Sequence, residues 1–374
     1  MKFQCDQQQM IQALNIVSKA VSVRTTIPTL KGILLEKDPN GNLLMTASDM
    51  DLTIQYSFPV DTKGEPFEGR EVVPARLFAD IVRKLPKGEL SFQSENGKAI
   101  IKSINSEFTI VTMPADEFPN IINTEENEET VPINKELFCD MIRKTSFAAS
   151  IDQTKGVING VLIELLPEEI RTVAIDGYRM AVCRTETINE KEKKVIISAS
   201  ILNELVKLLS DVHSEEEKVR FATDNKSAVL YYGGVKVMMR LIGGEFIKYN
   251  DILPKEFSID VKVKRTDLIN SVERASLLSR EGKNNLIKLA VTDKLITITS
   301  QSEEGAVKED LFCDKQGNDL TIGFNARYVL DMLRAIEDDT ILLRMNSPIT
   351  PCLALPLQGD AYQYLLLPVR ITNM

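Results

Sequence analysis

A pattern that occurs three times along the chain limits its possible folds more than any other feature of the sequence. Each copy has a small or turn residue, then alanine, then apolar residues at helical spacing with charged residues between them. The copies are PARLFADIVRKL, SASILNELVKLL and NARYVLDMLRAI, and their alanines, Ala75, Ala199 and Ala326, are 124 and 127 positions apart. Three repeats of about 125 residues therefore account for the whole chain.

The rest of each repeat keeps the same order of elements. An earlier amphipathic stretch begins at Met10, Leu137 and Leu268, and runs rich in β-branched residues follow each of the two helices. Asn96-Gly97 is typical of a hairpin turn. Because the links are too short for repeated parallel crossovers, the pattern predicts an α+β fold in which each repeat packs two helices on antiparallel sheets.

Two connectors separate the repeats. INTEENEETVP, ending at Pro132, and NDILPKE, around Pro254, have the polar and Pro-containing composition of solvated links. We therefore expect domains at residues 1–124, 130–250 and 254–374. An acidic binding tail is the alternative interpretation of the first connector.

Composition argues against an enzyme or a membrane protein. The one histidine, His213, lies in the acidic stretch DVHSEEEK, which favours a solvated loop residue over a catalytic base. The five cysteines are far apart and form no C-x-x-C pair, which is typical of free buried thiols. No Gly-rich phosphate loop, secretory signal or apolar run of roughly 20 residues is present. We expect a cytoplasmic protein without catalytic residues, metal, cofactor or membrane contact.

Charge is segregated by type of element. The net charge of −9 argues against a conventional nucleic-acid-binding protein, which carries an excess of basic residues where it contacts the grooves. The six predicted helices and their flanks nevertheless sum to +8, which leaves −17 on the remainder. Repetition places equivalent helix faces in register, so one shallow basic face is expected, able to hold DNA without sequence preference. Ordinary solvated helix faces with intrahelical ion pairs are the alternative.

Five segments spread over the whole length carry a resemblance. They are MKF with Arg24 and Pro28 downstream, RTVAIDGYRMAVCR from Arg171, ASLLSRE from Ala275, GFNARYVLDML from Gly323, and LLPVRI from Leu366. Together with the repeat they resemble the bacterial replication sliding clamp, the β subunit of DNA polymerase III. The resemblance implies three clamp domains per chain and a head-to-tail homodimer that forms a ring, with helices around duplex DNA and sheets outside.

The same resemblance implies a function and its partners. The chain would be a processivity factor in DNA replication, an accessory subunit with neither a catalytic site nor 3'-5' exonuclease activity. Its partners would be double-stranded DNA without sequence specificity, the catalytic subunit of DNA polymerase III, the clamp loader, and other polymerases and repair proteins. A three-repeat scaffold that binds peptides without encircling DNA is the alternative, and one histidine gives a hydrolase or metal enzyme little support.

Site residues follow from the resemblance, motif by motif. Partners would insert a short peptide, Gln-Leu-like and then Leu-Phe-like, into a cleft between the second and third repeats. Its residues would be Ile158, Ile175, Gly177, Tyr178, Arg179, Met180, Ile247, Ile252, Thr350, Leu365, Leu366, Leu367, Pro368, Val369, Arg370 and Ile371. For LLLPVRI the alternative is a buried edge strand, although Pro368 favours an exposed terminus. For Asp176 and Arg179 it is a structural ion pair beside a turn at Gly177.

DNA contacts and the subunit interface are implied in the same way. DNA contacts would fall on Arg24 and Lys155 first, and then on the helix residues Arg76, Arg83, Lys84, Lys207, Arg274 and Arg327. Solvated surface charge is the alternative for each of them. The interface would join Phe108 and Ile110 to Leu277 and Leu278, with burial inside their own domains as the alternative.

The sequence departs from the family pattern at four places. Tyr178 replaces a common histidine, and Gly156 with Val157 replaces possible aromatic rings in a DNA-facing loop. Asp251 replaces an arginine of some relatives, which disfavours acidic partner residues there. Residues 372–374 extend beyond the usual end and are a candidate cover for the cleft.

Overall fold

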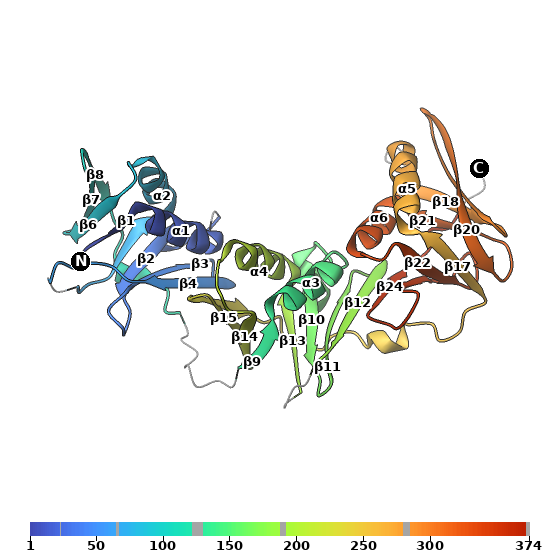
Figure 1. The fold of residues 1–374 in the computed structure, drawn as a ribbon, viewed down its shortest axis with the longest axis horizontal. Helices are drawn as coiled ribbons and strands as arrows, with labels where there is room; N and C mark the ends of the chain where they lie inside the picture. Colours follow the sequence, from blue (N-terminus) through green and yellow to red (C-terminus); the bar gives the residue numbers. More distant parts are fainter. Residues whose placement is uncertain (23, 65–66, 122–129, 188–191, 280–284, 372–374) are drawn as a thin grey trace. The chain divides into compact units, whose positions relative to one another are not determined.

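A computed structural model describes residues 1–22, 24–64, 67–121, 130–187, 192–279 and 285–371. Internal contacts divide the chain into two compact units, which we call the N-terminal unit (residues 1–138 and 204–241) and the C-terminal unit (residues 139–203 and 242–374). The second repeat is thus shared between them. Figure 1 shows helices and strands in each, and every strand pair among the described residues is antiparallel.

The N-terminal unit contains a four-stranded sheet in the order β1-β6-β7-β8 and an eight-stranded sheet in the order β5-β2-β3-β4-β16-β15-β14-β9. The four-stranded sheet consists of β1 (Lys2–Asp6), β6 (Glu89–Glu95), β7 (Lys98–Ser103) and β8 (Ser106–Val111). The other sheet consists of β2 (Gly32–Lys37), β3 (Leu43–Ser48), β4 (Leu52–Phe58), β5 (Glu71–Pro74), β9 (Val131–Asn134), β14 (Lys218–Thr223), β15 (Ser227–Tyr232) and β16 (Val235–Arg240).

The C-terminal unit contains one twelve-stranded sheet in the order β13-β10-β11-β12-β24-β23-β22-β17-β20-β19-β18-β21. Its strands from the second repeat are β10 (Gly160–Leu165), β11 (Glu169–Ile175), β12 (Arg179–Glu186) and β13 (Lys193–Ser198). Those from the third repeat are β17 (Ile259–Lys264), β18 (Leu286–Val291), β19 (Leu295–Ser302), β20 (Gly305–Gln316), β21 (Leu320–Asn325), β22 (Thr340–Met345), β23 (Cys352–Leu355) and β24 (Tyr362–Leu366).

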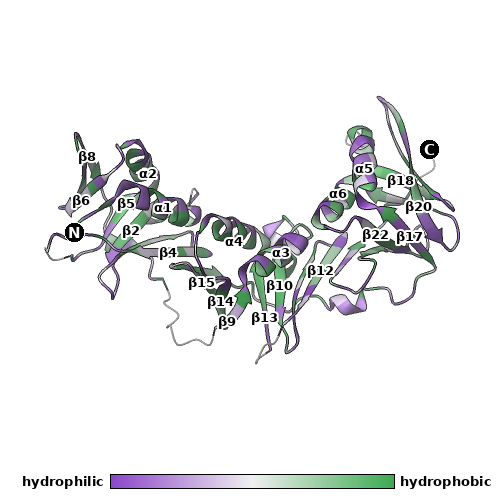
Figure 2. Cartoon of the chain, in the orientation of Figure 1, coloured by the Kyte–Doolittle hydropathy of each residue, from purple (hydrophilic) through white to green (hydrophobic). Residues whose placement is uncertain are grey.

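Within the described residues, each repeat contains two α-helices. They are α1 (Gln7–Val17) and α2 (Ala75–Lys84), α3 (Lys135–Ser146) and α4 (Ala199–Asp211), and α5 (Arg265–Ser279) and α6 (Ala326–Ala335). Short 3-10 turns are η1 (Ser18–Ala20), η2 (Pro28–Lys31), η3 (Ala115–Glu117), η4 (Gln153–Asn159) and η5 (Tyr249–Asp251). Figure 2 shows hydrophilic and hydrophobic residues interleaved along helices and strands, as expected of elements that bury one face.

Local chemistry explains where these helices begin. The second helix of each repeat starts at the predicted alanine: Ala75, Ala199 or Ala326. The Asp6 carboxylate caps α1 by accepting the backbone N–H groups of Gln8 and Gln9. Asn325 caps α6 in the same way. The helical spacing seen in the sequence is therefore confirmed in all three repeats.

Several smaller predictions can be compared with the structure. Asn96 and Gly97 join β6 to β7 with φ of 52° and 71°, the left-handed values that such a hairpin turn requires. His213 is exposed just after α4. Four cysteines are buried and free as expected, but Cys313 is only partly buried. The first connector was predicted to end at Pro132, but β9 already includes Val131 and Pro132, because this segment pairs with β14.

Two kinds of feature are absent from the part of the chain that the structure describes. Among the residues that the structure describes, no helix is long and apolar enough to cross a bilayer. Within the same residues, no group of three or more His, Cys, Asp or Glu side chains has an arrangement suited to a metal ion.

Candidate functional site

The second and third repeats share a continuous sheet in the C-terminal unit. Strand β12 pairs with β24, so that Met180 lies opposite Leu365 and Arg179 opposite Leu366. One face of the joined sheet carries a buried apolar cluster that includes Ile175, Met180 and Leu365. Candidate cleft residues that are far apart in the sequence therefore meet at this junction.

The connector between β16 and β17 covers this apolar face. Its side chains that pack on the cluster are Ile242, Phe246, Tyr249, Leu253 and Phe257, and Val157 and Ile158 join them from η4. Ile247 and Ile252 of the same connector remain 39% and 37% exposed. The connector thus buries one set of apolar side chains and presents another beside the cluster, where an apolar peptide side chain can pack.

The chain after β24 is held in place by backbone hydrogen bonds. The Leu367 N–H donates to the Tyr178 carbonyl at 2.8 Å, and the Val369 N–H donates to the Gly323 carbonyl at 2.8 Å. A Cβ atom at position 323 would lie 2.7 Å from the Val369 carbonyl oxygen, so only glycine allows this approach.

The apolar run from Leu365 to Leu367 was expected to offer exposed surface, and this is correct for Leu367 alone. Leu365 and Leu366 are 2% and 4% exposed because they belong to β24, whereas Leu367 follows the strand and is 38% exposed. Among the other candidates, Gly177, Tyr178 and Arg370 are exposed. Those that are partly buried are Ile158, Thr350, Pro368, Val369 and Ile371.

A tight turn between β11 and β12 presents Tyr178 to solvent. The Asp176 side chain accepts the backbone N–H groups of Tyr178 at 2.9 Å and Arg179 at 3.0 Å. Gly177 has φ of 93°, a conformation that residues with a side chain rarely adopt. The Tyr178 ring is 59% exposed and stacks on Tyr328 with 6.2 Å between ring centroids.

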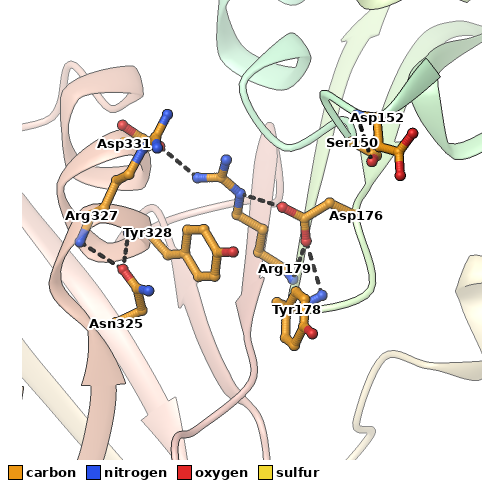
Figure 3. Close-up of polar contacts among 9 residues, drawn as sticks. All are labelled: Ser150, Asp152, Asp176, Tyr178, Arg179, Asn325, Arg327, Tyr328 and Asp331. Carbon is orange, nitrogen blue, oxygen red and sulfur yellow. Dashed lines mark hydrogen bonds and ion pairs between the residues drawn. The ribbon is translucent and has the colours of Figure 1, made fainter. Parts of the chain in front are cut away.

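Arg179 is buried beside this turn, and Figure 3 shows its side chain between Asp176 and Asp331. Its guanidinium donates to Asp176 at 2.9 Å and to Asp331 of α6 at 2.7 Å, and the residue is 7% exposed. The guanidinium carbon lies 4.4 Å from the Tyr328 ring centroid and 5.5 Å from that of Phe147. Arg179 therefore matches the structural ion pair that was its alternative interpretation, extended by an acid from the third repeat.

Sequence reasoning missed the partners of Arg179. Tyr328 and Asp331 lie on α6, and Asp331 is 152 positions from Arg179. The only local signal is that Tyr328 and Asp331 are three positions apart on an amphipathic helix and so lie on one side of it. The same spacing is also found on a helix face that is simply exposed to solvent, so it does not identify a partner for Arg179. Burial raises the pKa of Tyr328, and the nearby Asp176 carboxylate adds to this, so the phenol stays protonated at neutral pH.

The candidate DNA-contacting side chains are exposed, and several already have acidic or polar neighbours. Arg24, Lys155, Arg76 and Lys84 are exposed. Arg83 donates to Asn15, Lys207 pairs with Glu204, Arg274 pairs with Glu309, and Arg327 lies 4.0 Å from Asp331. The Arg274 guanidinium holds the pKa of Glu309 below its usual value. Phosphate would compete with these pairs, so individual contacts should be weak.

The candidate interface residues differ in exposure. Phe108 on β8 is 40% exposed and Leu277 on α5 is 65% exposed, while Leu278 is partly buried. Ile110 was expected at the interface but is 6% exposed, because it lies opposite buried Ala99 of β7 and belongs to the core of the first repeat. Its side chain therefore offers little surface to another chain.

Comparison with known proteins assigns the family. Models of the DNA polymerase III beta subunit match residues 1–122 (N-terminal domain), 132–248 (central domain) and 250–370 (C-terminal domain). The Beta sliding clamp of Staphylococcus epidermidis is 32% identical over 379 residues, covering 99% of both chains. The chain belongs to the bacterial sliding clamps. Sliding clamps are non-catalytic accessory subunits of DNA polymerase III that act as processivity factors.

Solved sliding clamps have the same three-domain fold. The clamp of Bacillus subtilis has a TM-score of 0.93 at 30% identity and covers 100% of each chain. A putative beta subunit from Eubacterium rectale has a TM-score of 0.92 at 30% identity, covering 99% of this chain and 100% of its own. The clamp of Pseudomonas aeruginosa bound to griselimycin has a TM-score of 0.90 at 26% identity, with coverage of 99% and 100%.

The positions that depart from the clamp pattern have defined surroundings, apart from residues 372–374, which lie outside the described residues. Tyr178 contributes an exposed aromatic ring, and Asp251 is exposed in η5. Gly156 has φ of 60° within η4, so the loop bends there. Cys183 and Cys352 offer no thiolate at neutral pH, since burial raises the pKa of Cys183 to about 11 and of Cys352 to about 12.

Replacing Arg179 by methionine should lower the free energy of unfolding by about 3 kcal/mol, because Asp176 and Asp331 would lose their shared cation. Urea denaturation of the C-terminal unit, read in the intact protein, measures this. Arg327→Met is the matched control, since Arg327 also lies near Asp331 but is 70% exposed. Its effect should stay within about 0.5 kcal/mol. Equal effects of the two substitutions would contradict the assignment.

Proposed function

We propose that two copies of this clamp close head to tail into a ring around duplex DNA. In this proposal, the ring holds the catalytic subunit of DNA polymerase III, the clamp loader and other partners through a peptide cleft between the second and third repeats. The domains are proposed at residues 1–124, 130–250 and 254–374, and the partners imply a cytoplasmic location. Tethering raises the polymerase concentration at the primer end, so a modest peptide affinity suffices for long synthesis.

The proposed ring is supported by a strand pairing that occurs twice within the chain. Strand β4 of the first repeat pairs with β16, the last strand of the second, and β12 of the second repeat pairs with β24, the last strand of the third. The equivalent strand of the third repeat is β20, and the last strand of the first repeat is β8. Among the described residues, each of these two strands has an unpaired edge. Strand β8 lies at the end of its sheet. Strand β20 pairs with β17 only beyond Phe312, so the part of β20 before that point has no neighbouring strand on that side.

A second copy satisfies both edges at once. Placing β8 of one chain against β20 of the next repeats the pairing of the two internal junctions, and two such contacts close a ring. Large apolar side chains are exposed on β8 and the turn before it, namely Ile104 (76%), Phe108 (40%) and Val111 (70%). Leu277 and Leu278 are the proposed counterparts on α5, which packs against β20. Exposed apolar groups at a strand edge favour association.

The charge distribution supports encirclement over tight DNA binding. The helices and their flanks carry +8 within a chain of net −9, and several of their cations are engaged by acidic neighbours. Such a surface binds phosphate weakly and without sequence preference. A closed ring needs no stronger contact, because geometry prevents escape while the protein slides.

The first junction provides an internal control for the cleft. It has the same turn as the second, since Asp49 accepts the N–H groups of Asp51 and Leu52 as Asp176 does for its own turn. The side chains at equivalent ladder positions differ, however: Thr46, Ser48, Thr53 and Gln55 replace Val173, Ile175, Met180 and Val182. The polar set bonds internally, with 2.7 Å between the Ser48 and Thr53 hydroxyls. Only the second junction therefore offers apolar peptide anchors a favourable environment.

A ligand-bound relative agrees with a binding site on this fold. The Pseudomonas aeruginosa clamp was solved with griselimycin, and its structure covers 99% of this chain. The proposed cleft comprises the apolar cluster at the second junction, the exposed connector isoleucines, Tyr178, and the segment from Leu367 to Ile371. Arg370, which is exposed, is the proposed partner for the peptide backbone or an acidic group.

Replacing Leu277 and Leu278 together by alanine should weaken the dimer at least about a hundredfold, since both contacts of the ring lose buried apolar groups. Sedimentation across a dilution series measures the change. Leu357→Ala is the control, because Leu357 is a 48% exposed leucine of the same repeat outside the proposed interface. A double variant that remains dimeric at every dilution at which the parent does would disprove this interface.

A clamp loaded on nicked circular DNA should survive a high-salt wash and be lost once the circle is cut. Salt abolishes binding that depends on counterion release, but it does not open a closed ring. Gel filtration of labelled clamp with circular and linearised DNA tests this. Equal loss from both DNAs would instead favour a scaffold that binds peptides without encircling DNA.

Leu367→Ala should weaken binding of a fluorescent Gln-Leu-x-Leu-Phe peptide about tenfold, because a few exposed apolar anchors dominate such contacts. Leu357→Ala is again the matched control and should leave the affinity unchanged. Fluorescence anisotropy gives both dissociation constants. If the two variants bound equally well, the cleft would have to lie elsewhere, and if Leu367→Ala dissociated the dimer, the tail would be structural.

A further inference from the structure

A buried carboxylate on the second repeat has partners from three other segments. Glu164 of β10 is 4% exposed and lies opposite Arg171 of β11 and Lys194 of β13. The Tyr249 hydroxyl donates to Glu164 Oε2 at 2.6 Å and accepts from Arg171 Nη1 at 2.6 Å. Lys194 Nζ lies 2.9 Å from Glu164 Oε1. Both carboxylate oxygens are therefore satisfied, and the tyrosine alone among these partners comes from outside the sheet.

Tyr249 is suited to a fixed position. It is 4% exposed, its ring belongs to the apolar cluster of the second junction, and its hydroxyl reaches the charged row beside that cluster. Burial raises the pKa of Tyr249, and the hydrogen bond to Glu164 raises it further, so the hydroxyl remains a donor at neutral pH. A hydroxyl placed between a carboxylate and a guanidinium makes charge-assisted hydrogen bonds, which are stronger than neutral ones.

The connector that carries Tyr249 is attached at three places. At its start the Ile242 N–H donates to the Ile196 carbonyl at 2.8 Å, and at its end the Ser258 N–H donates to the Met345 carbonyl at 3.3 Å. The first of these bonds is to the second repeat and the last is to the third. Tyr249 is the attachment between them, close to the middle of the segment.

The attachment sets the direction of the cleft wall. Ile252 N–H donates to the Tyr249 carbonyl at 3.1 Å, and Tyr249 N–H donates to the Ile247 carbonyl at 2.7 Å, so the backbone turns tightly around this residue. With Tyr249 pointing into the sheet, Ile247 and Ile252 are left 39% and 37% exposed on the outer side. Freeing the Tyr249 side chain would allow both isoleucines to move together.

We propose that Tyr249 is a positioning residue for the peptide cleft, and that its hydroxyl, held by Glu164 and Arg171, fixes the wall formed by Ile247 and Ile252. This inference rests on the proposed cleft, and it adds that the Tyr249 hydroxyl holds one wall of that cleft in place. Pre-ordering matters because a wall that must be immobilised during binding reduces the net affinity. Tyr249 need not touch the peptide.

Tyr249→Phe is the test, because it removes the hydroxyl and keeps the buried ring. It should weaken binding of the Gln-Leu-x-Leu-Phe peptide on the order of tenfold. It should also speed trypsin cleavage after Lys248 by a similar factor, because Lys248 is exposed but the backbone around it must leave its folded position before the protease can cut it. Ser57→Ala is the matched control. It removes another hydroxyl that donates to a carboxylate at 2.6 Å, that of Asp38, in the N-terminal unit. The control should change neither reading.

A double-mutant cycle separates positioning from general destabilisation. In an Ile247→Ala, Ile252→Ala background, Tyr249→Phe should cause little further loss of peptide affinity, because the wall it positions is gone. A full additional loss would overturn the inference, as would a Tyr249→Phe variant with parental affinity and parental cleavage. Failure of the parent protein to bind the peptide would instead reject the proposed cleft. Should Tyr249→Phe not fold, Glu164→Gln, which keeps an oxygen for the hydroxyl but removes the charge, should change both readings in the same direction by less.

Discussion

The architecture depends on one constraint, that the exposed edge of each repeat's sheet must be paired. Inside the chain this happens twice, at β4–β16 and at β12–β24, and each junction joins one repeat to the next by main-chain hydrogen bonds. Main-chain hydrogen bonds do not depend on which side chains are present, so the repeats can diverge in sequence and still form the junction. The edges of β8 and β20 remain, and we propose that a second copy of the chain pairs them by the same rule.

Because backbone pairing sets the framework, side chains at equivalent positions are free to differ in function. At the first junction they are threonine, serine and glutamine, which bond to one another, and at the second they are aliphatic. Arg179 and Tyr249 are buried polar residues at the second junction, and each forms hydrogen bonds to charged side chains on other segments. Each joins two segments that border the proposed cleft. In our proposal these polar interactions fix the shape of the cleft, and its apolar surface supplies the peptide affinity.

The elements were predictable where the signal is local. The second helix of each repeat begins at its predicted alanine, and Asn96-Gly97 forms the predicted hairpin turn, because capping and turn chemistry depend on a few neighbouring residues. The resemblance in motifs, now supported by the family match, identified the clamp. Pairing between distant segments was not predictable: neither the link from Arg179 to Asp331 nor that from Tyr249 to Glu164 has a sequence period.

The candidate site shows the same division. Exposed Tyr178 and Leu367 were found from the motifs, whereas Leu365, Leu366 and Ile110 were expected to offer surface and are buried. Leu365 and Leu366 are buried because β24 lies between β12 and β23 inside the twelve-stranded sheet, and Ile110 is buried opposite Ala99 of β7. These strand pairings join segments that are distant in the sequence. Sequence motifs therefore indicated the residues of the proposed cleft, and strand pairing decides which of them are accessible.

The proposed ring requires the two unpaired edges to close between two chains. Sedimentation equilibrium of the unmodified protein over a wide dilution range distinguishes a closed ring from other states. We expect a single species of about twice 41.9 kDa that persists to low concentration, because separating it requires breaking two equivalent contacts together. A mass of 41.9 kDa at high concentration, or a series of growing oligomers, would contradict closure.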